Sequence, residues 1–397
     1  MKWILKGLAT LSLMVATAAV TFCVTVYQMG GVSENPAEAK IEEIRRYLDL
    51  FFIDDYDEGK VVEAGRTAMG DAAAKAMVEA TGDEWSYYVS AADYKSAHER
   101  SENAYVGIGV TIEDDAEGRG FAVREVASGG PADLGGVLPG DILVTVEGES
   151  VLELGQQGTV DRVVGEAGTE VTLTFLRGED FLELTLMRAS IVSTVATLEM
   201  LDGVGLITIK NFDRHAAEQA LAAIENAIGQ GATALVFDVR NDPGGYADEM
   251  VAILDRLLPE GVLFQSRDYA GKKEEERSDA VCVELPMAVM VNGESYSAAE
   301  FFAAAMQEYG AAKIVGEQTY GKGNFQYEFS LSDGSAVWLS AGKYYTPNGV
   351  SLAGVGVTPD VTVELDDEQF YELYYGRLAR DEDPQLQTAL ELVRESS

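Results

Sequence analysis

The sequence predicts a multidomain chain with an α/β core and a parallel-containing sheet, an inserted β-rich domain, and a helical N-terminal region after a transmembrane anchor. Three observations predict this. The N-terminus holds a long uncharged run, a later region has short strands separated by glycine turns, and beyond it strands alternate with helices, which is typical of a parallel sheet. The expected divisions are an anchor at residues 1–33, a helical region at 34–102, the β-rich domain at 103–189, the α/β core at 190–365 and a C-terminal helical segment at 366–397.

The charge balance limits the classes of partner. The 397 residues include 67 acidic and 29 basic side chains, for a formal net charge of -38, so nucleic acid is an unfavourable partner for this surface. The carboxylates are spread along the chain rather than grouped at metal-ligand spacing. The two cysteines, Cys23 and Cys282, form no zinc motif. We therefore expect no metal and no cofactor.

The N-terminal run predicts a membrane anchor. Lys2 and Lys6 precede it, and no charged residue occurs from Gly7 to Gly31. About 20 apolar residues are enough to span a bilayer as a helix. The preceding lysines place the N-terminus in the cytoplasm and the remaining chain outside, in a single-pass protein of the cell membrane. An uncleaved signal anchor is favoured, and a cleaved signal peptide is the alternative.

The next two regions have contrasting patterns. Residues 38–100 are expected to be helical, because apolar residues such as Ile41 and Ile44 recur at three- and four-residue spacings. The β-rich domain that follows has alternating strands with glycine turns. Its expected strands cover residues 106–112, 120–126, 141–148 and 170–178.

The α/β core has strands at residues 204–210, 233–239 and 287–292. A helix with Asp213 as its N-cap candidate follows the first strand, and another runs from about Ser297 to Glu308. Ligands of parallel sheets meet the loops at the carboxyl ends of the strands, so those loops are the place to look for a site.

One such loop carries a candidate nucleophile. The segment V-N-G-E-S-Y-S-A-A-E at 291–300 leaves a strand and enters a helix, where a serine hydroxyl is exposed and backbone N–H groups face a developing oxyanion. Ser297 is the better-placed serine and Ser295 the alternative. Serines also cap helices commonly, so a second feature is needed.

The segment G-K-G-N-F-Q at 321–326 supplies that feature. Glycines on both sides allow Lys322 to approach another segment closely, although a surface lysine in a glycine turn is the alternative. A lysine acting as general base needs its pKa lowered from about 10.4 by roughly three units, or about 4 kcal/mol, which burial can impose. A serine activated in this way needs no imidazole, and neither His98 nor His215 has catalytic surroundings.

A third segment, R-N-D-P-G-G at 240–245, follows a strongly apolar strand. The N–H of Gly244 is a candidate oxyanion-hole donor beside the N–H of Ala298. A plain tight turn is the alternative.

In this order, the motifs resemble those of the carboxyl-terminal processing peptidases, the tail-specific serine proteases. Aligning Glu300 with the last residue of the family segment N-x-x-S-A-S-A-S-E selects Ser297 over Ser295 as nucleophile. The family motif G-K-G-x-x-Q implies Lys322 as general base and Gln326 as the residue that holds it in place. Lys322 follows Ser297 by 25 residues, from 297 to 322, as the resemblance requires. Residues 84–90, 343–360 and 383–390 also resemble family segments.

The β-rich domain resembles a PDZ domain. The stretch Y-V-G-I-G-V at 105–110 stands in the place of the carboxylate-binding loop, and residues 129–141 resemble a second signature. The resemblance implies that the N–H groups of Gly107, Ile108 and Gly109 cradle a terminal carboxylate, with Val110 completing the peptide-binding set. The peptide would add as a strand to the edge of the sheet.

We therefore expect a serine endopeptidase that cleaves proteins near free, mostly apolar C-termini. A non-catalytic PDZ scaffold and a small-ligand-binding relative are the rival functions, and the presence of both Ser297 and Lys322 disfavours them. Tyr296, Ala299, Asp242 and Asn324-Phe325 depart from the family pattern, which leaves the substrate preference open. A homo-oligomer is compatible with the sequence.

Overall fold

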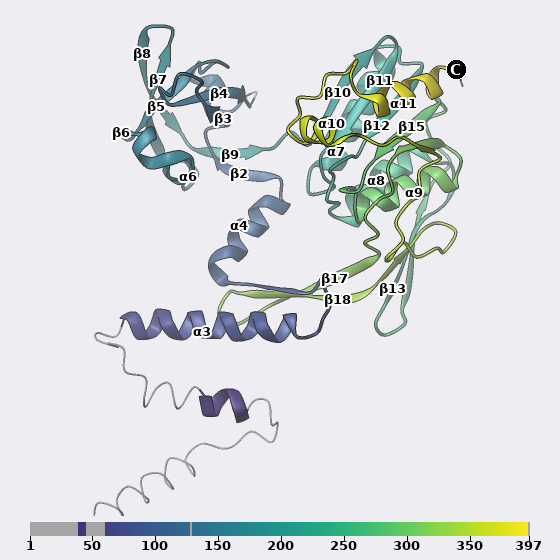
Figure 1. Cartoon of the computed structure of the whole chain (residues 1–397), viewed down its shortest axis with the longest axis horizontal. Helices are drawn as coiled ribbons and strands as arrows, with labels where there is room; N and C mark the ends of the chain where they lie inside the picture. The colour runs from purple at the N-terminus through teal and green to yellow at the C-terminus, as the bar shows by residue number, and fades with distance from the viewer. Residues whose placement is uncertain (1–38, 45–59, 128, 396–397) are drawn as a thin grey trace, which may run out of the picture. The chain divides into compact units, whose positions relative to one another are not determined.

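A computed structural model describes residues 39–44, 60–127 and 129–395 (Figure 1). The chain forms two compact units, residues 1–70 and 71–397, which are described separately. The predicted anchor at residues 1–33 lies outside the described residues. Among the helices that are described, none is long and apolar enough to cross a membrane.

The region expected to be helical contains a strand. The first unit has a helical turn at 39–44 and the beginning of α3 (Lys60–Glu79). In the second unit, α3 is followed by β1 (Tyr87–Val89) and then by α4 (Ala91–Ser101). β1 pairs with the distant strand β18 (Ala336–Tyr345), where Tyr87 stacks on Trp338 with ring centroids 5.1 Å apart. This pairing is tertiary, so a local helical pattern could not indicate it.

The β-rich domain is a sheet with strand order β3-β4-β5-β7-β8, and β6 pairs with β5. Its elements are β3 (Val110–Asp114), β4 (Phe121–Val126), α5 (Pro131–Leu134), β5 (Ile142–Val146), β6 (Glu149–Ser150), α6 (Val151–Val163), β7 (Glu170–Arg177) and β8 (Asp180–Met187). β2 (Ala104–Gly107) and β9 (Ala189–Val192) pair at the entry to the domain and the exit from it. The single strand expected at 106–112 is therefore divided, because Gly109, with φ +80°, separates β2 from β3.

The α/β core contains a six-stranded sheet. Its strands, in spatial order, are β10 (Ala196–Leu201), β11 (Val204–Ile209), β12 (Ala234–Asp238), β15 (Met287–Val291), β16 (Ala312–Gly316) and β19 (Val361–Thr362). β10 is antiparallel to β11, and all the other neighbours are parallel. The expected parallel-containing sheet is confirmed.

Helices cover both faces of this sheet. One face packs against α7 (Ala216–Gly229), α8 (Ala247–Leu257) and α9 (Ala298–Glu308), and the other against α11 (Pro384–Glu395). Side chains alternate between faces along a strand, so Phe237 belongs to the first core and Val236 to the second. Burial on both faces explains why the central strands are apolar throughout.

The N-cap of α7 is His215, with φ +70°, and not Asp213 as expected. The N–H of Asp213 donates to Asn211 Oδ1 at 3.0 Å, so the turn before the helix is held by a side chain two residues back. A pattern of N-cap residue types does not distinguish these two positions.

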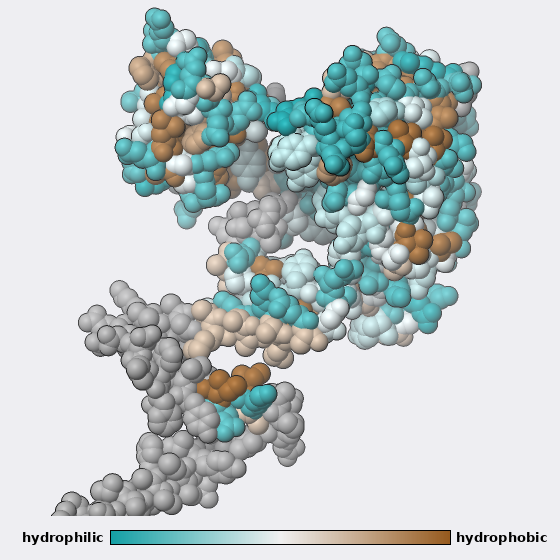
Figure 2. Space-filling model, in the orientation of Figure 1, coloured by the Kyte–Doolittle hydropathy of each residue, from teal (hydrophilic) through white to brown (hydrophobic). Residues whose placement is uncertain are grey.

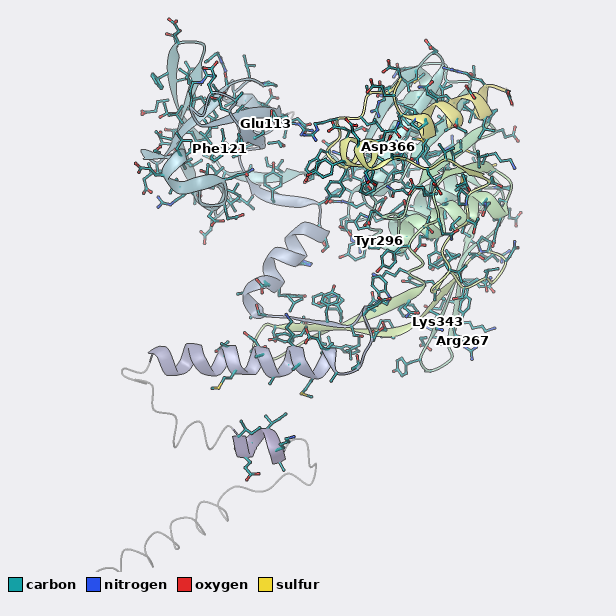
Figure 3. The ribbon with its side chains drawn as sticks, viewed as in Figure 1. Glu113, Phe121, Arg267, Tyr296, Lys343 and Asp366 are labelled. Atoms are coloured by element: carbon teal, nitrogen blue, oxygen red, sulfur yellow. The ribbon has the colours of Figure 1, made fainter. Side chains whose placement is uncertain are left out.

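A second, antiparallel sheet was not predicted. It contains β1, β18, β13 (Gly261–Asp268) and β14 (Lys273–Ser278) in that order, and β17 (Asn324–Ser330) also pairs with β18. Arg267 lies opposite Lys343 in the pairing of β13 with β18 (Figure 3). The C-terminal segment holds α10 (Asp367–Tyr374) and α11. Hydrophilic residues cover much of the visible surface (Figure 2).

Candidate active site

The site is built from three loops that follow β12, β15 and β16. Because these strands are parallel neighbours, their carboxyl ends lie at one edge of the sheet. Backbone hydrogen bonds join the loops to one another. The N–H of Tyr296 donates to Asp242 O at 3.1 Å, and the N–H of Tyr320 donates to Ser295 O at 3.2 Å. The three predicted segments are therefore brought together.

Ser297 is the N-cap of α9 and has an unusual backbone conformation, with φ 59° and ψ -122°. A positive φ is uncommon for a residue other than glycine and costs about 1–3 kcal/mol. The side chain is half-buried. Strain of this kind concentrates at functional sites, so Ser297 is a nucleophile candidate on backbone geometry as well as on sequence.

Ser295 has a different environment. Its side chain is fully buried, and its hydroxyl donates to Val239 O at 2.7 Å and accepts from the N–H of Asn292 at 3.1 Å. These bonds tie the loop after β15 to the end of β12. The Ser295 hydroxyl thus has a structural role, which separates the two candidate serines.

Glu300 connects the serine and lysine segments. Its Oε2 accepts from the N–H of Ser297 at 2.9 Å and from the N–H of Lys322 at 2.8 Å. Its Oε1 accepts from the Thr319 hydroxyl and the N–H of Gly321, both at 2.6 Å. Burial raises the pKa of Glu300, and these four donors oppose that rise. Sequence reasoning used Glu300 only to align the motif, although its spacing from Ser297 is that of a capping box.

Lys322 lies in a tightly packed turn. Gly321 has φ +96°, and a Cβ on Gly323 would lie 2.5 Å from Ala353 N, so both flanking glycines are required by close approach. The ammonium Nζ lies 4.6 Å from the centroid of the Trp85 ring, a cation–π contact. Burial lowers the pKa of Lys322, and the charge of Glu300 opposes this.

Gln326 and Trp85 complete the surroundings of the lysine. The side-chain amide of Gln326 donates to Asn324 O at 3.5 Å and to Ser340 Oγ at 3.4 Å. Within the described residues, no hydrogen bond joins the Lys322 ammonium to Ser297 or Gln326. Trp85 was not singled out from the sequence, because its contact with Lys322 depends on the pairing of β1 with β18.

Gly244 lies directly against the nucleophile segment. With φ +88°, it would place a Cβ 2.8 Å from Ser297 Cβ and 2.9 Å from Ala298 N, which only glycine avoids. The N–H of Gly244 donates to Asp242 Oδ1 at 2.8 Å. Both predicted oxyanion-hole residues, Gly244 and Ala298, are therefore next to Ser297.

The predicted peptide-binding residues lie at the start of the β-rich domain. Gly107 ends β2, and Val110 begins β3, the strand at the edge of its sheet. The side chain of Ile108 is buried in the domain core, and its carbonyl accepts from the N–H of Ala132 at 2.8 Å. Glu113, further along β3, is exposed (Figure 3).

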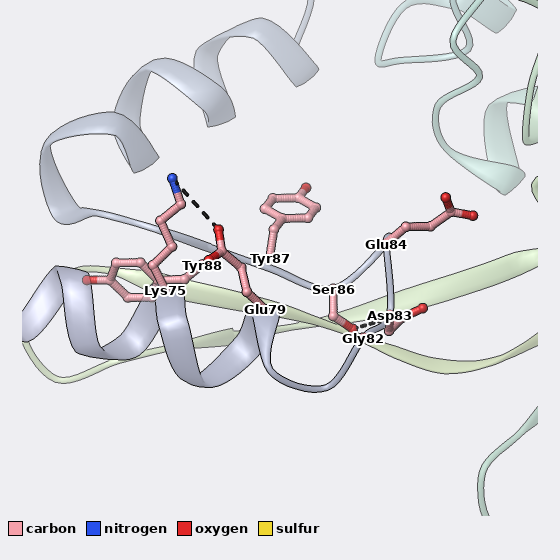
Figure 4. Close-up of a pocket in the computed structure, with 8 residues that line it drawn as sticks. All are labelled: Lys75, Glu79, Gly82, Asp83, Glu84, Ser86, Tyr87 and Tyr88. Carbon is pink, nitrogen blue, oxygen red and sulfur yellow. Dashed lines mark hydrogen bonds and ion pairs between the residues drawn. The ribbon is translucent and has the colours of Figure 1, made fainter. Parts of the chain in front are cut away.

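A pocket of about 430 Å³ lies beside β1 (Figure 4). It is lined by Lys75, Glu79, Gly82, Asp83, Glu84, Ser86, Tyr87 and Tyr88. None of the candidate catalytic residues lines it. In the part of the chain that the structure describes, no group of three or more histidine, cysteine, aspartate or glutamate side chains is arranged to hold a metal ion.

Comparisons with known proteins match both domains. Residues 203–363 match the model of peptidase family S41, and residues 123–177 match a PDZ domain model. A probable CtpA-like serine protease of Staphylococcus saprophyticus is 28% identical over 365 residues, covering 89% of this chain and 72% of the relative. Its counterpart in Staphylococcus aureus is 28% identical over 373 residues, covering 91% and 73%. The solved photosystem II D1 C-terminal processing protease is 26% identical, with a TM-score of 0.48, covering 87% of this chain and 92% of that one.

Proposed function

The chain is a family S41 serine peptidase of the C-terminal processing type with a PDZ domain, and on that premise we propose that Ser297 and Lys322 form its catalytic dyad. One observation carries the proposal: a single carboxylate oxygen of Glu300 accepts from the N–H groups of both residues, at 2.9 and 2.8 Å. That bridge holds the backbone of the two loops together, with the proposed nucleophile on one and the proposed base on the other.

The dyad would work through an acyl-enzyme. Ser297 Oγ attacks the peptide carbonyl carbon while the neutral amine of Lys322 takes the hydroxyl proton and returns it to the leaving amine. Water then attacks the ester, with Lys322 again as the base. Burial favours the neutral amine by lowering the pKa of Lys322. Gln326 would hold Lys322 once the ammonium leaves the Trp85 ring, and the N–H groups of Gly244 and Ala298 would bind the oxyanion.

The dyad is tested by digesting an unfolded protein with an apolar C-terminal tail. Ser297→Ala and Lys322→Ala should each lower kcat/KM by about 10³-fold or more, because a dyad acts as a unit. Lys313→Ala removes an exposed lysine on β16 and serves as the matched control, with parental activity expected. Cleavage by either dyad variant at the parental rate would refute the assignment.

We also propose that the PDZ domain reads the substrate's C-terminal tail by adding it as a strand to β3, through the set Gly107, Ile108, Gly109 and Val110. β3 lies at the edge of its sheet, which supports this mode. A substrate amidated at its C-terminus should be cleaved about tenfold more slowly than one with a free carboxylate. Equal rates for the two substrates would count against tail recognition.

The membrane placement stays a proposal. Residues 1–33 would anchor the enzyme in the cell membrane, with the N-terminus in the cytoplasm and the catalytic region outside, so that the substrates are extracytoplasmic proteins. The uncharged run supports it. Extraction of membranes at alkaline pH tests it, since an integral protein stays with the lipid.

A further inference from the structure

A buried carboxyl group lies directly behind the proposed oxyanion hole. Asp242 is fully buried in the loop after β12. Its Oδ1 accepts from the N–H of Gly244 at 2.8 Å, the same N–H that is proposed to bind the oxyanion. Its Oδ2 is buried and has no hydrogen-bond partner among the described residues. Burying an unpaired oxygen is unfavourable for either form of the carboxyl group, but the cost is far larger for the charged carboxylate than for the neutral acid.

The charged and titratable groups that face Asp242 do not offset a negative charge. Asp213, from the loop before α7, and Asp238, at the end of β12, both add negative charge. Arg240, two residues before Asp242 in the chain, is held by Asp238 at 2.7 Å and by Asp383 at 2.9 Å. Tyr296, on the neighbouring loop, is a further titratable group facing Asp242. Burial first, and then the two carboxylates, raise the pKa of Asp242 well above its ordinary value.

We propose that Asp242 is a positioning residue of the oxyanion hole whose carboxyl group must be uncharged for efficient peptide hydrolysis, so that its ionisation slows the reaction. The inference rests on the proposed function. It assigns this residue no proton transfer: the acid keeps its proton throughout the cycle and acts only through the N–H of Gly244.

Two effects make ionisation inhibitory. An ionised carboxylate is a much stronger acceptor than the carbonyl oxygen of a neutral acid, so it competes with the substrate oxyanion for the N–H of Gly244. It also places a full negative charge next to the oxyanion that develops in the transition state, in a region with little water to screen it. Losing one oxyanion-hole donor costs about 10²- to 10³-fold in rate, and we expect an ionised Asp242 to cost at least the lower figure.

The pH dependence follows from two opposite requirements. Lys322 has to be neutral to act as a base, so the rate rises with pH as this lysine loses its proton. Asp242 has to be protonated, so the rate falls with pH as this carboxyl ionises. Together they give a bell-shaped profile of kcat/KM, whose alkaline limb belongs to Asp242.

The experiment measures kcat/KM against pH for a peptide with a free apolar tail, using the full chain and the Asp242→Asn variant. The parent should lose about 10²-fold on the alkaline limb, and Asp242→Asn should rise to a plateau with no alkaline limb. Asn keeps an acceptor for the N–H of Gly244 but cannot ionise, so a purely structural role would lower the rate at every pH and leave the profile's shape unchanged.

Two further variants make the outcome specific. Asp213→Asn removes a neighbouring carboxylate and should keep the alkaline limb, moved to lower pH, because Asp242 then ionises more easily. Asp242→Ala should also lack the limb, which covers the case in which the buried amide of Asn disturbs folding. An alkaline limb retained in both Asp242 variants overturns the inference.

The same experiment separates this inference from the proposed function. If the Ser297→Ala variant cleaves the peptide at the parental rate, both the proposed function and this inference are wrong. An inactive Ser297→Ala variant together with a parental alkaline limb in both Asp242→Asn and Asp242→Ala defeats the inference alone. Infrared spectroscopy reports the protonation state of Asp242 independently of the rate. The band of a protonated carboxyl group should be present in the parent at its optimum pH and missing from Asp242→Asn. Absence of this band from the parent also overturns the inference.

Discussion

Ser297 has a strained backbone that its neighbours keep in place. The positive φ of 59° costs about 1–3 kcal/mol in a residue other than glycine. The N–H of this residue donates to a buried carboxylate oxygen of Glu300 at 2.9 Å, and hydrogen bonds to charged groups contribute about 1.5–3 kcal/mol each. One such bond is therefore large enough to offset the strain, and three further donors hold Glu300 itself.

The residue scale also gives a prediction for stability. Burial raises the pKa of Asp213 to about 6, against 3.8 in the unfolded chain. The folded state therefore binds the proton more tightly, so the contribution to stability is fully present below pH 3.8 and is lost as pH rises through about 6. The complete effect is about 3 kcal/mol at most. The Asp213→Asn variant has no carboxyl group to ionise here, so it does not lose this stability as pH rises. The difference in unfolding free energy between variant and parent should therefore be about 1 kcal/mol larger, in favour of the variant, at pH 8 than at pH 5.

Urea unfolding at the two pH values measures this difference. Asp202→Asn is the control for loss of one negative charge, because the Asp202 side chain is 95% exposed. An Asp213→Asn advantage that is the same at pH 5 and pH 8 would mean that the burial of Asp213 does not affect its proton affinity in the folded state.

At the scale of elements, the loop after β12 and the start of α9 are packed with no space for a methyl group. Gly244 has a left-handed φ of +88°, and a Cβ at this position would clash with Ser297. Both the backbone conformation and the close contact therefore require glycine. Parallel pairing of β12 with β15 brings these loops to the same edge. The proposed oxyanion hole is thus a consequence of strand order.

Gly244→Ala should combine backbone strain with a steric clash. We expect a loss of about 2–4 kcal/mol in unfolding free energy and at least about 10²-fold in kcat/KM, because Cβ would displace Ser297 and Ala298. Gly231→Ala is the matched control, since Gly231 has φ +83° and open space around its Cβ position. It should cost about 1–2 kcal/mol from strain alone and keep parental activity. Equal activity losses in the two variants would show that the contact with Ser297 is unimportant.

At the scale of the whole molecule, the net charge of -38 dominates the electrostatics. Like charges spread over one surface repel and destabilise the compact state, and salt weakens that repulsion because the Debye length falls from about 10 Å at 0.1 M to about 3 Å at 1 M. Salt also weakens exposed ion pairs, but these contribute only about 0–1 kcal/mol each.

We therefore expect Tm to rise with salt. Between 0.02 and 0.5 M NaCl the rise should be about 1–2.5 °C, which corresponds to about 1–2 kcal/mol for a chain of this size. Differential scanning calorimetry measures it, and KCl is the control for effects specific to sodium. A Tm that falls over this range would show that ion pairs outweigh the net repulsion.

Some features of the fold and site could be predicted from local sequence. Alternation of strands and helices predicted the parallel sheet, because the two periodicities differ along the chain itself. The S-x-x-E spacing from Ser297 to Glu300 is equally local. β1 and the contact of Trp85 with Lys322 could not be predicted in this way, since both depend on β18, far along the chain.

The sequence by itself determined the order of the elements, the acidic charge and the candidate serine and lysine, since all of these are properties of residue type and spacing. Only the tertiary structure decided that Ser295 is fully buried while Ser297 is half-buried, that Glu300 joins the two loops, and that Asp242 lies behind Gly244. The physical reason is that burial and hydrogen bonding depend on segments brought together by strand pairing, and local spacing carries no record of which distant segments will meet.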